Sequence, residues 1–207
     1  ILVTSCIKGE GKSFVSSNLA ISLARSGKKV ALLEMDLHQP QISQIFQLES
    51  QKGITDFLDN KASYEELVIP SGKHENLSVI SAGYPAEEPS ELLTSSRLEI
   101  LLRYLDKDFD HIVIDSAPFK ALTDSFTIAQ YCNLVLTVIR HNHTPSKLVE
   151  LINTDMETHE IRNVAIIFNG VKARGMGKYS YGYGYGYGYD QKSAYNAYYS
   201  KKMKKVG

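Results

Sequence analysis

The segment of residues 5–13 constrains the fold of this chain more than any other stretch. It follows an apolar start at residues 1–3, precedes a helical pattern and ends in Gly11-Lys12-Ser13. A glycine-rich turn between a strand and a helix directs backbone N–H groups towards phosphate oxygens. In such a turn Lys12 reaches the β- and γ-phosphates and Ser13 holds Mg²⁺. The segment therefore predicts a site for a nucleoside triphosphate, and the alternative is a glycine-rich turn that binds no ligand.

The loop departs from the usual motif at its first position. The spacing G-x-x-x-x-G-K-[ST] places a glycine where this chain has Cys6. Gly9 and Gly11 remain as positions that accept a left-handed backbone. We interpret Cys6 as a small residue in a tight turn, with a redox-sensitive thiol as the alternative. The residues of this segment that we predict to bind the nucleotide are Gly9, Glu10, Gly11, Lys12, Ser13 and Phe14.

Composition limits the class of protein. A chain of 207 residues with 43% hydrophobic content suits one domain with a substantial core. It shows no run of about 18 apolar residues and no signal-peptide pattern, so we expect no membrane span within it. It begins inside its first predicted strand without a methionine, which indicates a fragment of a longer protein. Cys6 and Cys132 lie in dissimilar contexts, which favours reduced thiols over a disulfide.

Charge is distributed unevenly along the chain. Residues 171–207 contain eight Lys or Arg and one Asp, a formal charge of +7, and since the whole chain is neutral, residues 1–170 carry −7. A basic segment joined to an acidic one favours contact between the two, within one chain or between neighbouring chains. We therefore expect no nucleic-acid partner.

Short apolar runs alternate with helical patterns up to residue 170. They predict strands at residues 1–4, 30–35, 77–80, 111–115, 134–140 and 164–169, and helices at 12–26, 41–46, 54–58, 95–105, 125–131 and 145–158. Apolar strands separated by helices indicate a mostly parallel central sheet flanked by helices, which is the three-layer α/β fold of P-loop NTPases. In the first helix we expect Val15, Leu19 and Leu23 to lie on one stripe.

The last part of the chain has a different composition. Residues 171–207 are mainly Tyr, Gly, Lys and Ser, which predicts a flexible low-complexity tail beside a nucleotide-binding domain of residues 1–170. Nine of the 13 tyrosines lie in the last 29 residues. Glycines between them give the backbone freedom to bring each hydroxyl into an active site, whereas the alternative is a tail whose tyrosines serve association. The candidate phosphate acceptors are Tyr179, Tyr181, Tyr183, Tyr185, Tyr187, Tyr189, Tyr195, Tyr198 and Tyr199.

Acidic residues end two of the predicted strands. Asp115 ends one of them, and Glu34 and Asp36 end another, on one face because they alternate with Met35. Ligands bind at the carboxyl ends of parallel strands, so we expect Asp115 to contact Mg²⁺ directly or through water. Two carboxylates beside a triphosphate suit metal coordination and proton acceptance from an attacking hydroxyl. The alternatives are a helix cap at Asp115 and a solvated turn at residues 34–40.

Two histidines form a weaker signal. His141 and His143 follow a predicted strand and are separated by one residue. We interpret them as part of a solvated loop, with a metal-binding pair as the alternative.

In their order along the chain, the phosphate-binding loop and the two strands that end in acidic residues resemble segments of the bacterial tyrosine kinases of capsule and exopolysaccharide export. That family has Asp-x-Asp-x-Arg where this chain has Glu34-Met35-Asp36-Leu37-His38. Residues 89–93 followed by Arg97, and Thr123-Asp124, resemble further blocks of the family. The strand that ends in Asn169 resembles the base-contacting position of related ATPases. The resemblance covers about residues 1–170.

The resemblance implies roles for individual residues, with ATP and Mg²⁺ as cofactors. Lys12 binds phosphate, and Ser13, Asp36 and Asp115 organise Mg²⁺. Glu34 is the candidate base for the tyrosine hydroxyl. The catalytic set is thus Lys12, Glu34, Asp36 and Asp115, and Asn169 joins the nucleotide-binding residues. Glu34 and His38 stand where the family has Asp and Arg, and both departures concern turnover more than nucleotide binding.

The resemblance also implies a function: an ATP-dependent tyrosine kinase that phosphorylates the tail of a neighbouring subunit in a ring-like homo-oligomer. A tail of 37 residues has an r.m.s. span of about 30–36 Å, which reaches a neighbour. The chain would be the soluble domain of a longer protein at the cytoplasmic side of the inner membrane. An upstream chain-length regulator or activator and a phosphatase would be its partners.

Two other functions stay open. One is an ATPase switch of the partitioning type, against which stand the tyrosine-rich tail and Ile7, where those ATPases carry a lysine. The other is a nucleotide-binding scaffold with weak catalysis, which the departures at Glu34 and His38 keep open.

Overall fold

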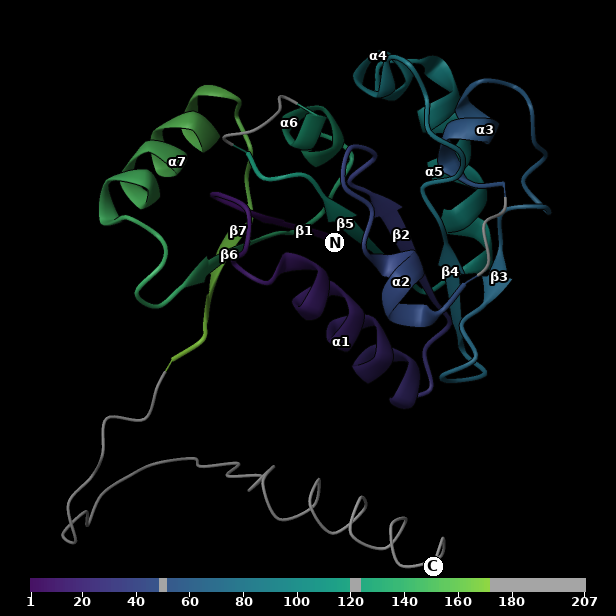
Figure 1. Cartoon of the computed structure of the whole chain (residues 1–207), viewed down its shortest axis with the longest axis horizontal. Coiled ribbons are helices and arrows are strands. Elements are labelled where there is room, and N and C mark those ends of the chain that lie inside the picture. The colour runs from purple at the N-terminus through teal and green to yellow at the C-terminus, as the bar shows by residue number, and fades with distance from the viewer. Residues whose placement is uncertain (49–51, 120–123, 172–207) are drawn as a thin grey trace, which may run out of the picture. The chain divides into compact units, whose positions relative to one another are not determined.

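The computed structural model describes residues 1–48, 52–119 and 124–171. These residues form one α/β unit with a central sheet between two layers of helices (Figure 1). The chain divides into the units Ile1–Lys172 and Ala173–Gly207. The nine candidate acceptor tyrosines and nearly all of the predicted tail lie outside the described residues.

Seven strands form the sheet, in the order β3-β4-β2-β5-β1-β6-β7. Every neighbouring pair is parallel except β3 and β4. The mostly parallel sheet predicted from the apolar runs is therefore confirmed, while the short edge strand β3 was not predicted. The strands are β1 Leu2–Ser5, β2 Val30–Met35, β3 Ile69–Pro70, β4 Leu77–Ile80, β5 His111–Ser116, β6 Val135–Arg140 and β7 Val164–Asn169.

Helices cover both faces of this sheet. Side chains of α1 and α2 share one apolar cluster with the strands, and side chains of α3 to α7 share the other. The three-layer arrangement follows (Figure 1). The helices are α1 Lys12–Arg25, α2 Ile42–Phe46, α3 Ile54–Leu58, α4 Pro89–Leu93, α5 Ser96–Asp108, α6 Asp124–Ala129 and α7 Ser146–Thr158.

Helix α1 packs on the sheet through small side chains, beside the stripe predicted from the sequence. Val15, Leu19 and Leu23 are only partly buried and pack at the periphery of the cluster. The buried face consists instead of Ser13, Ser16, Ser17, Ala20 and Ala24. Small residues let the helix axis approach the strands closely, and Ser16 and Ser17 satisfy their buried hydroxyls by donating to the Ser13 carbonyl.

The sheet order determines where the site lies. Strand β5 pairs with β1 on one side and β2 on the other. The loop after β1, the residues after β2 and the end of β5 therefore meet at one edge.

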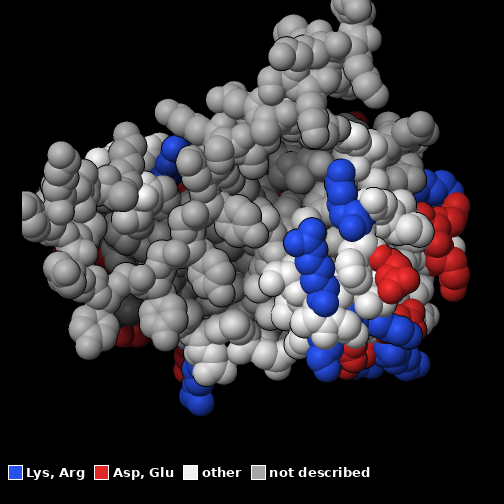
Figure 2. Space-filling model, turned by 90° about the horizontal axis from the view of Figure 1, so that it is seen from below, with Lys and Arg blue, Asp and Glu red and all other residues white. Residues whose placement is uncertain are grey.

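Figure 2 shows one face of the molecule. Basic and acidic side chains are interspersed over the part of this face that the described residues form.

Candidate active site

The loop between β1 and α1 has the backbone that its glycines predict. Gly9 and Gly11 have φ values of 87° and 95°, in the left-handed region. Cys6 is not among the described residues with a positive φ, so the position of the motif's first glycine needs no glycine here. Burial raises the pKa of the Cys6 thiol to about 12, which leaves it protonated and unreactive near neutral pH. These observations favour a packing role for Cys6 over a redox role.

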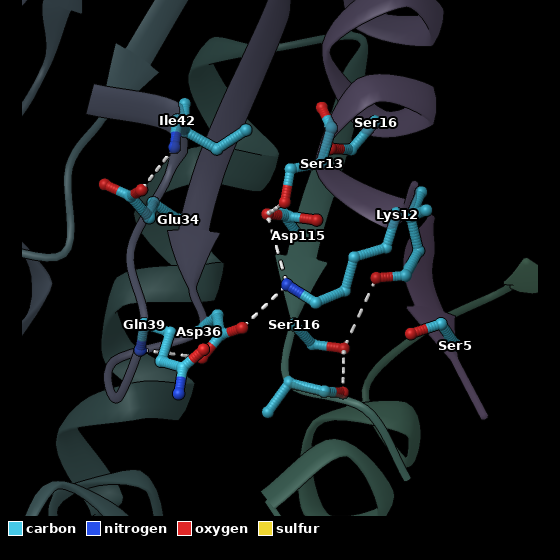
Figure 3. Close-up of polar contacts among 12 residues, drawn as sticks. Ser5, Lys12, Ser13, Ser16, Glu34, Asp36, Gln39, Ile42, Asp115 and Ser116 are labelled. Atoms are coloured by element: carbon cyan, nitrogen blue, oxygen red, sulfur yellow. Dashed lines mark hydrogen bonds and ion pairs between the residues drawn. The ribbon is translucent and has the colours of Figure 1, made fainter. Parts of the chain in front are cut away.

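Lys12 lies between two carboxylates, that of Asp36 just after β2 and that of Asp115 in β5. Its Nζ is 2.6 Å from Asp36 Oδ2 and 3.9 Å from Asp115 Oδ2 (Figure 3). Ser13 donates its hydroxyl to Asp115 Oδ2 at 2.7 Å. The structure thus brings together the four residues that the sequence assigned to phosphate and metal: Lys12, Ser13, Asp36 and Asp115.

Asp115 carries an unsatisfied oxygen. Its Oδ1 is buried and has no hydrogen-bond partner among the described residues, although Oδ2 is engaged. Burial raises the pKa of Asp115 to about 6, and the nearby Lys12 ammonium only partly opposes this effect. A free carboxylate oxygen beside a serine hydroxyl and a second carboxylate is a donor set that suits Mg²⁺, which takes one or two carboxylates and keeps phosphate oxygens and water as its other ligands. Ser13, Asp36 and Asp115 therefore fit a magnesium ion.

A cavity of about 640 Å³ opens beside these residues, a volume in the range of small-molecule sites. It lies between the phosphate-binding loop and the segment that follows β2. Of the predicted residues, Gly9, Gly11, Lys12, Ser13, Phe14 and Asp36 line it. Ile7 and His38, which were named above for other reasons, also line it, as do Lys8, Gln39, Gln41, Ile45, Ala117 and Pro118.

Glu34 does not lie in this cavity. It is fully buried, and its carboxylate accepts hydrogen bonds from the N–H groups of Ile42 at 2.5 Å, Ser43 at 3.3 Å and Ala82 at 3.2 Å. The Ser43 hydroxyl donates to it as well, at 2.5 Å. Figure 3 shows the Glu34 side chain turned towards Ile42, away from Lys12. The predicted role of Glu34 as a base does not fit this position, and its contacts make it an anchor for the start of α2.

The substitution Glu34→Gln separates these two roles. We expect the free energy of unfolding to fall by about 1–3 kcal/mol, because an amide group must face donors that now meet a carboxylate. We expect turnover of the folded variant to stay within about tenfold, since loss of a general base costs a factor of about 10²–10⁴. Urea unfolding and turnover at saturating ATP measure the two effects, with the exposed Glu66→Gln as control. Unchanged stability together with a loss of about a thousandfold in turnover would restore Glu34 as the base.

Two other predicted nucleotide-binding residues, Glu10 and Asn169, make hydrogen bonds that support the loop. The buried Glu10 carboxylate accepts hydrogen bonds from Ile7 N–H, at 2.8 Å, and from the Thr144 hydroxyl. Asn169 donates its amide to the Glu10 carbonyl at 2.8 Å and accepts from Gly170 N–H. Neither residue is among those that line the cavity. The contact of Asn169 with a nucleotide base stays a prediction.

The remaining segments that carried the resemblance meet partly at the rim of the cavity. His38 Nε2 lies 3.4 Å from Asp124 Oδ2 and 3.3 Å from Ser90 Oγ, and Ser90 donates to Asp124. Arg97 lies elsewhere, with Nε donating to a carbonyl of α3 at 2.7 Å. Thr123 is outside the described residues. The imidazole thus stands at the position of the family's arginine and joins α4 and α6 to the segment after β2.

Comparison with known proteins decides the family. A P-loop NTPase family model, ParA, described as NUBPL iron-transfer P-loop NTPase, matches residues 1–167. The tyrosine-protein kinase ptk of Acinetobacter johnsonii is 38% identical over 167 residues, which are 81% of this chain and 23% of that protein. The tyrosine-protein kinase YwqD of Bacillus subtilis is 30% identical over 179 residues, which are 86% of this chain and 75% of that protein. The chain belongs to the bacterial tyrosine kinases.

A solved structure of this kinase family has the same fold. The kinase domain of the Escherichia coli tyrosine kinase ETK superposes with a TM-score of 0.80 at 30% identity, covering 88% of this chain and 71% of that one. The resemblance and the P-loop fold predicted from the sequence are confirmed. The chain spans about a quarter of the length of several kinases that it matches. Within the described residues, no helix of this kinase-family chain is long and apolar enough to cross a membrane.

Proposed function

We propose that this chain is the catalytic domain of an ATP-dependent protein tyrosine kinase. The observation that carries the proposal is the convergence of Lys12, Ser13, Asp36 and Asp115 beside a cavity of about 640 Å³, in a chain of the tyrosine-kinase family. Asp115 Oδ1 is buried without a hydrogen-bond partner among the described residues, and a coordinated cation would satisfy it.

Each part of the site has its own role in phosphoryl transfer. The loop amides bind the phosphates, and Lys12 moves from Asp36 to the β- and γ-phosphates, whose charge exceeds that of one carboxylate. Ser13 and Asp115 would hold Mg²⁺, with Asp36 beside them, and the ion would neutralise charge on the phosphate oxygens. The protein thereby supplies position and charge, which are the main contributions to catalysis of this reaction.

Asp36 takes the place of Glu34 as the acceptor of the tyrosine proton. It lines the cavity, and within the part of the chain that the structure describes its Oδ2 accepts from Lys12 alone, whereas Oδ1 accepts from Gln39 N–H. When Lys12 turns to the phosphates, Oδ2 becomes available. The tyrosine oxygen then forms a bond to the γ-phosphorus, its proton passes to Asp36, and the bond to the β-phosphate oxygen breaks to release ADP.

The tail supplies the acceptors in this proposal. Tyrosines of residues 179–199 enter the site of a neighbouring subunit in a ring-like assembly, since glycines separate them and the tail's span reaches a neighbour. Each phosphate adds about −1.5 to −2 charges, so about four phosphates cancel the tail's +7 and loosen its attraction to the acidic domain. The family resemblance supports a place at the cytoplasmic side of the inner membrane, with an upstream chain-length regulator or activator, a phosphatase, and a role in capsule or exopolysaccharide export.

Mass spectrometry of tail peptides tests the reaction and its direction. The Lys12→Met chain, with its tail intact, is mixed with an otherwise unaltered chain whose nine tail tyrosines are phenylalanine, and Mg-ATP is added. We expect phosphotyrosine on the Lys12→Met tail, because only the partner can transfer phosphate to it. An unmodified tail in the mixture, beside a modified tail in the unaltered chain alone, contradicts transfer between subunits. Free phosphate without phosphotyrosine favours the ATPase switch, and neither product favours the scaffold.

A further inference from the structure

Three consecutive carbonyls of the phosphate-binding loop are held from outside by side chains. His143 Nε2 lies 2.9 Å from the Lys8 oxygen, where it must donate because a carbonyl only accepts. Arg140 Nη1 donates to the Gly9 oxygen at 2.8 Å. The next carbonyl in the chain, that of Glu10, accepts from Asn169. Strand β6, the turn after it and the end of β7 thus hold the back of the loop.

These bonds determine which way the loop amides point. In a planar trans peptide the C=O and the N–H of the following residue point in opposite directions. Holding the carbonyls of residues 8, 9 and 10 on the outside therefore turns the N–H groups of residues 9, 10 and 11 to the inside of the loop. Successive inward amides form the anion-binding concavity that a phosphate requires.

The turn that supplies two of these donors is itself fixed. Arg140 donates its N–H to the Thr144 hydroxyl oxygen at 2.8 Å, and His143 and Thr144 both donate their N–H groups to the Arg140 carbonyl. Thr144 in turn donates its hydroxyl to the buried Glu10 carboxylate. Arg140, His143 and Thr144, which we call the loop brace, are therefore locked to one another as well as to the loop.

The loop and its neighbours fit closely. A Cβ atom on Gly9 would lie 3.3 Å from His143 Nε2, and one on Gly11 would lie 2.3 Å from Asn169 Nδ2.

His141, unlike His143, packs its ring edge-on against Phe168, with the two ring centroids 5.9 Å apart. The two histidines thus serve different contacts, which does not support the metal-binding pair.

We propose that Arg140 and His143, supported by Thr144, are positioning residues for nucleotide binding: they hold the phosphate-binding loop with its amides directed at the phosphates. The inference rests on the proposed function in one respect, that a nucleotide phosphate is the ligand of this loop. The brace touches neither the reacting atoms nor the magnesium ligands, so it acts on affinity for the nucleotide and leaves the chemical step to Lys12, Asp36 and Asp115.

Calorimetric titration with Mg-ADP at 20 °C tests this inference. We expect Arg140→Ala/His143→Ala to weaken binding about tenfold, since two hydrogen bonds of about 0.7 kcal/mol each orient the loop. Arg140→Lys/His143→Gln, which keeps a donor at each position, should bind within about threefold of the unaltered chain. Lys147→Ala, an exposed residue at the start of α7, is the matched control. In turnover assays, KM for ATP should rise while kcat changes less.

The readouts distinguish the inference from the proposed function. Binding of Mg-ADP by the unaltered chain tests the proposed function, and failure to bind overturns both. The ratio of affinities between variant and unaltered chain tests the brace. A lower thermal midpoint without weaker binding would make the brace merely structural and overturn the inference, as would equal weakening by Lys147→Ala. If the double variant does not fold, His143→Ala against His143→Gln gives the same comparison, with an expected difference of about threefold.

Discussion

Replacing Lys12 by methionine lowers kcat/KM for tyrosine phosphorylation by about a thousandfold or more, the loss expected when the cation that stabilises the transferred phosphoryl group is removed. The structure adds a second consequence. The Lys12 ammonium lies between the carboxylates of Asp36 and Asp115, both nearly inaccessible to solvent. Without it two buried acids face each other unneutralised, so we also expect the free energy of unfolding to fall by about 1–3 kcal/mol above pH 6.

Both effects have direct measurements. Phosphotyrosine formation at saturating Mg-ATP gives the loss of activity, and urea unfolding at pH 7.5 gives the loss of stability. Lys28→Met, an exposed substitution after α1, controls for the removal of a surface charge. Retention of phosphotyrosine formation in Lys12→Met would remove this residue from the site, whatever happens to stability.

Replacing Asp115 by asparagine moves activity and stability in opposite directions. Phosphotransfer that depends on Mg²⁺ should fall by about a thousandfold, since the residue supplies a metal ligand that bears charge. The nucleotide-free protein should become more stable at pH 7.5. Asp115 has its pKa raised by burial, which means that its charged form costs folding energy and an uncharged isostere does not.

The pH dependence follows from the same shift. The pKa of Asp115 is about 6 in the folded chain against an ordinary value of 3.8, so between these values the folded state binds the proton that the unfolded state has released. Stability from this group therefore decreases as pH rises through that window. Urea unfolding at pH 4 and pH 7.5 should show a smaller decrease for Asp115→Asn than for the unaltered chain. Mg²⁺ should stabilise only the unaltered chain above pH 6, and equal stabilisation of both would contradict the assigned ligand.

The sequence predicts most of the fold because a buried parallel sheet has a strong local signal. Strands such as β2 and β5 contain apolar runs, at residues 30–33 and 112–114, and helices follow them at regular intervals. Strand β3 has two residues, one of them a proline, and therefore shows no apolar run. The stripe of larger apolar residues on α1 packs against the apolar cluster, but it does not reveal that serine and alanine make the closest contact with the sheet.

The residues of the candidate site, too, were predictable only in part. Lys12, Asp36 and Asp115 were predictable because parallel strands bring their carboxyl ends to one edge. The alternation of Glu34 and Asp36 with Met35 does not reveal that α2 covers Glu34 through residues 42 and 43 and the chain at residue 82. The loop brace had no local signal at all, since Arg140 is 131 residues from its partner Gly9.

The ratio of phosphotyrosine to ADP in the first turnovers tests the proposed activity most directly. The unaltered chain is mixed with Mg-ATP, and phosphotyrosine on the chain, ADP and free phosphate are quantified over time. We expect phosphotyrosine and ADP to rise in equal amounts, without free phosphate, and neither to form with Lys12→Met. ADP accompanied by an equal amount of free phosphate, with no phosphotyrosine, would contradict a tyrosine kinase and show that water accepts the phosphoryl group.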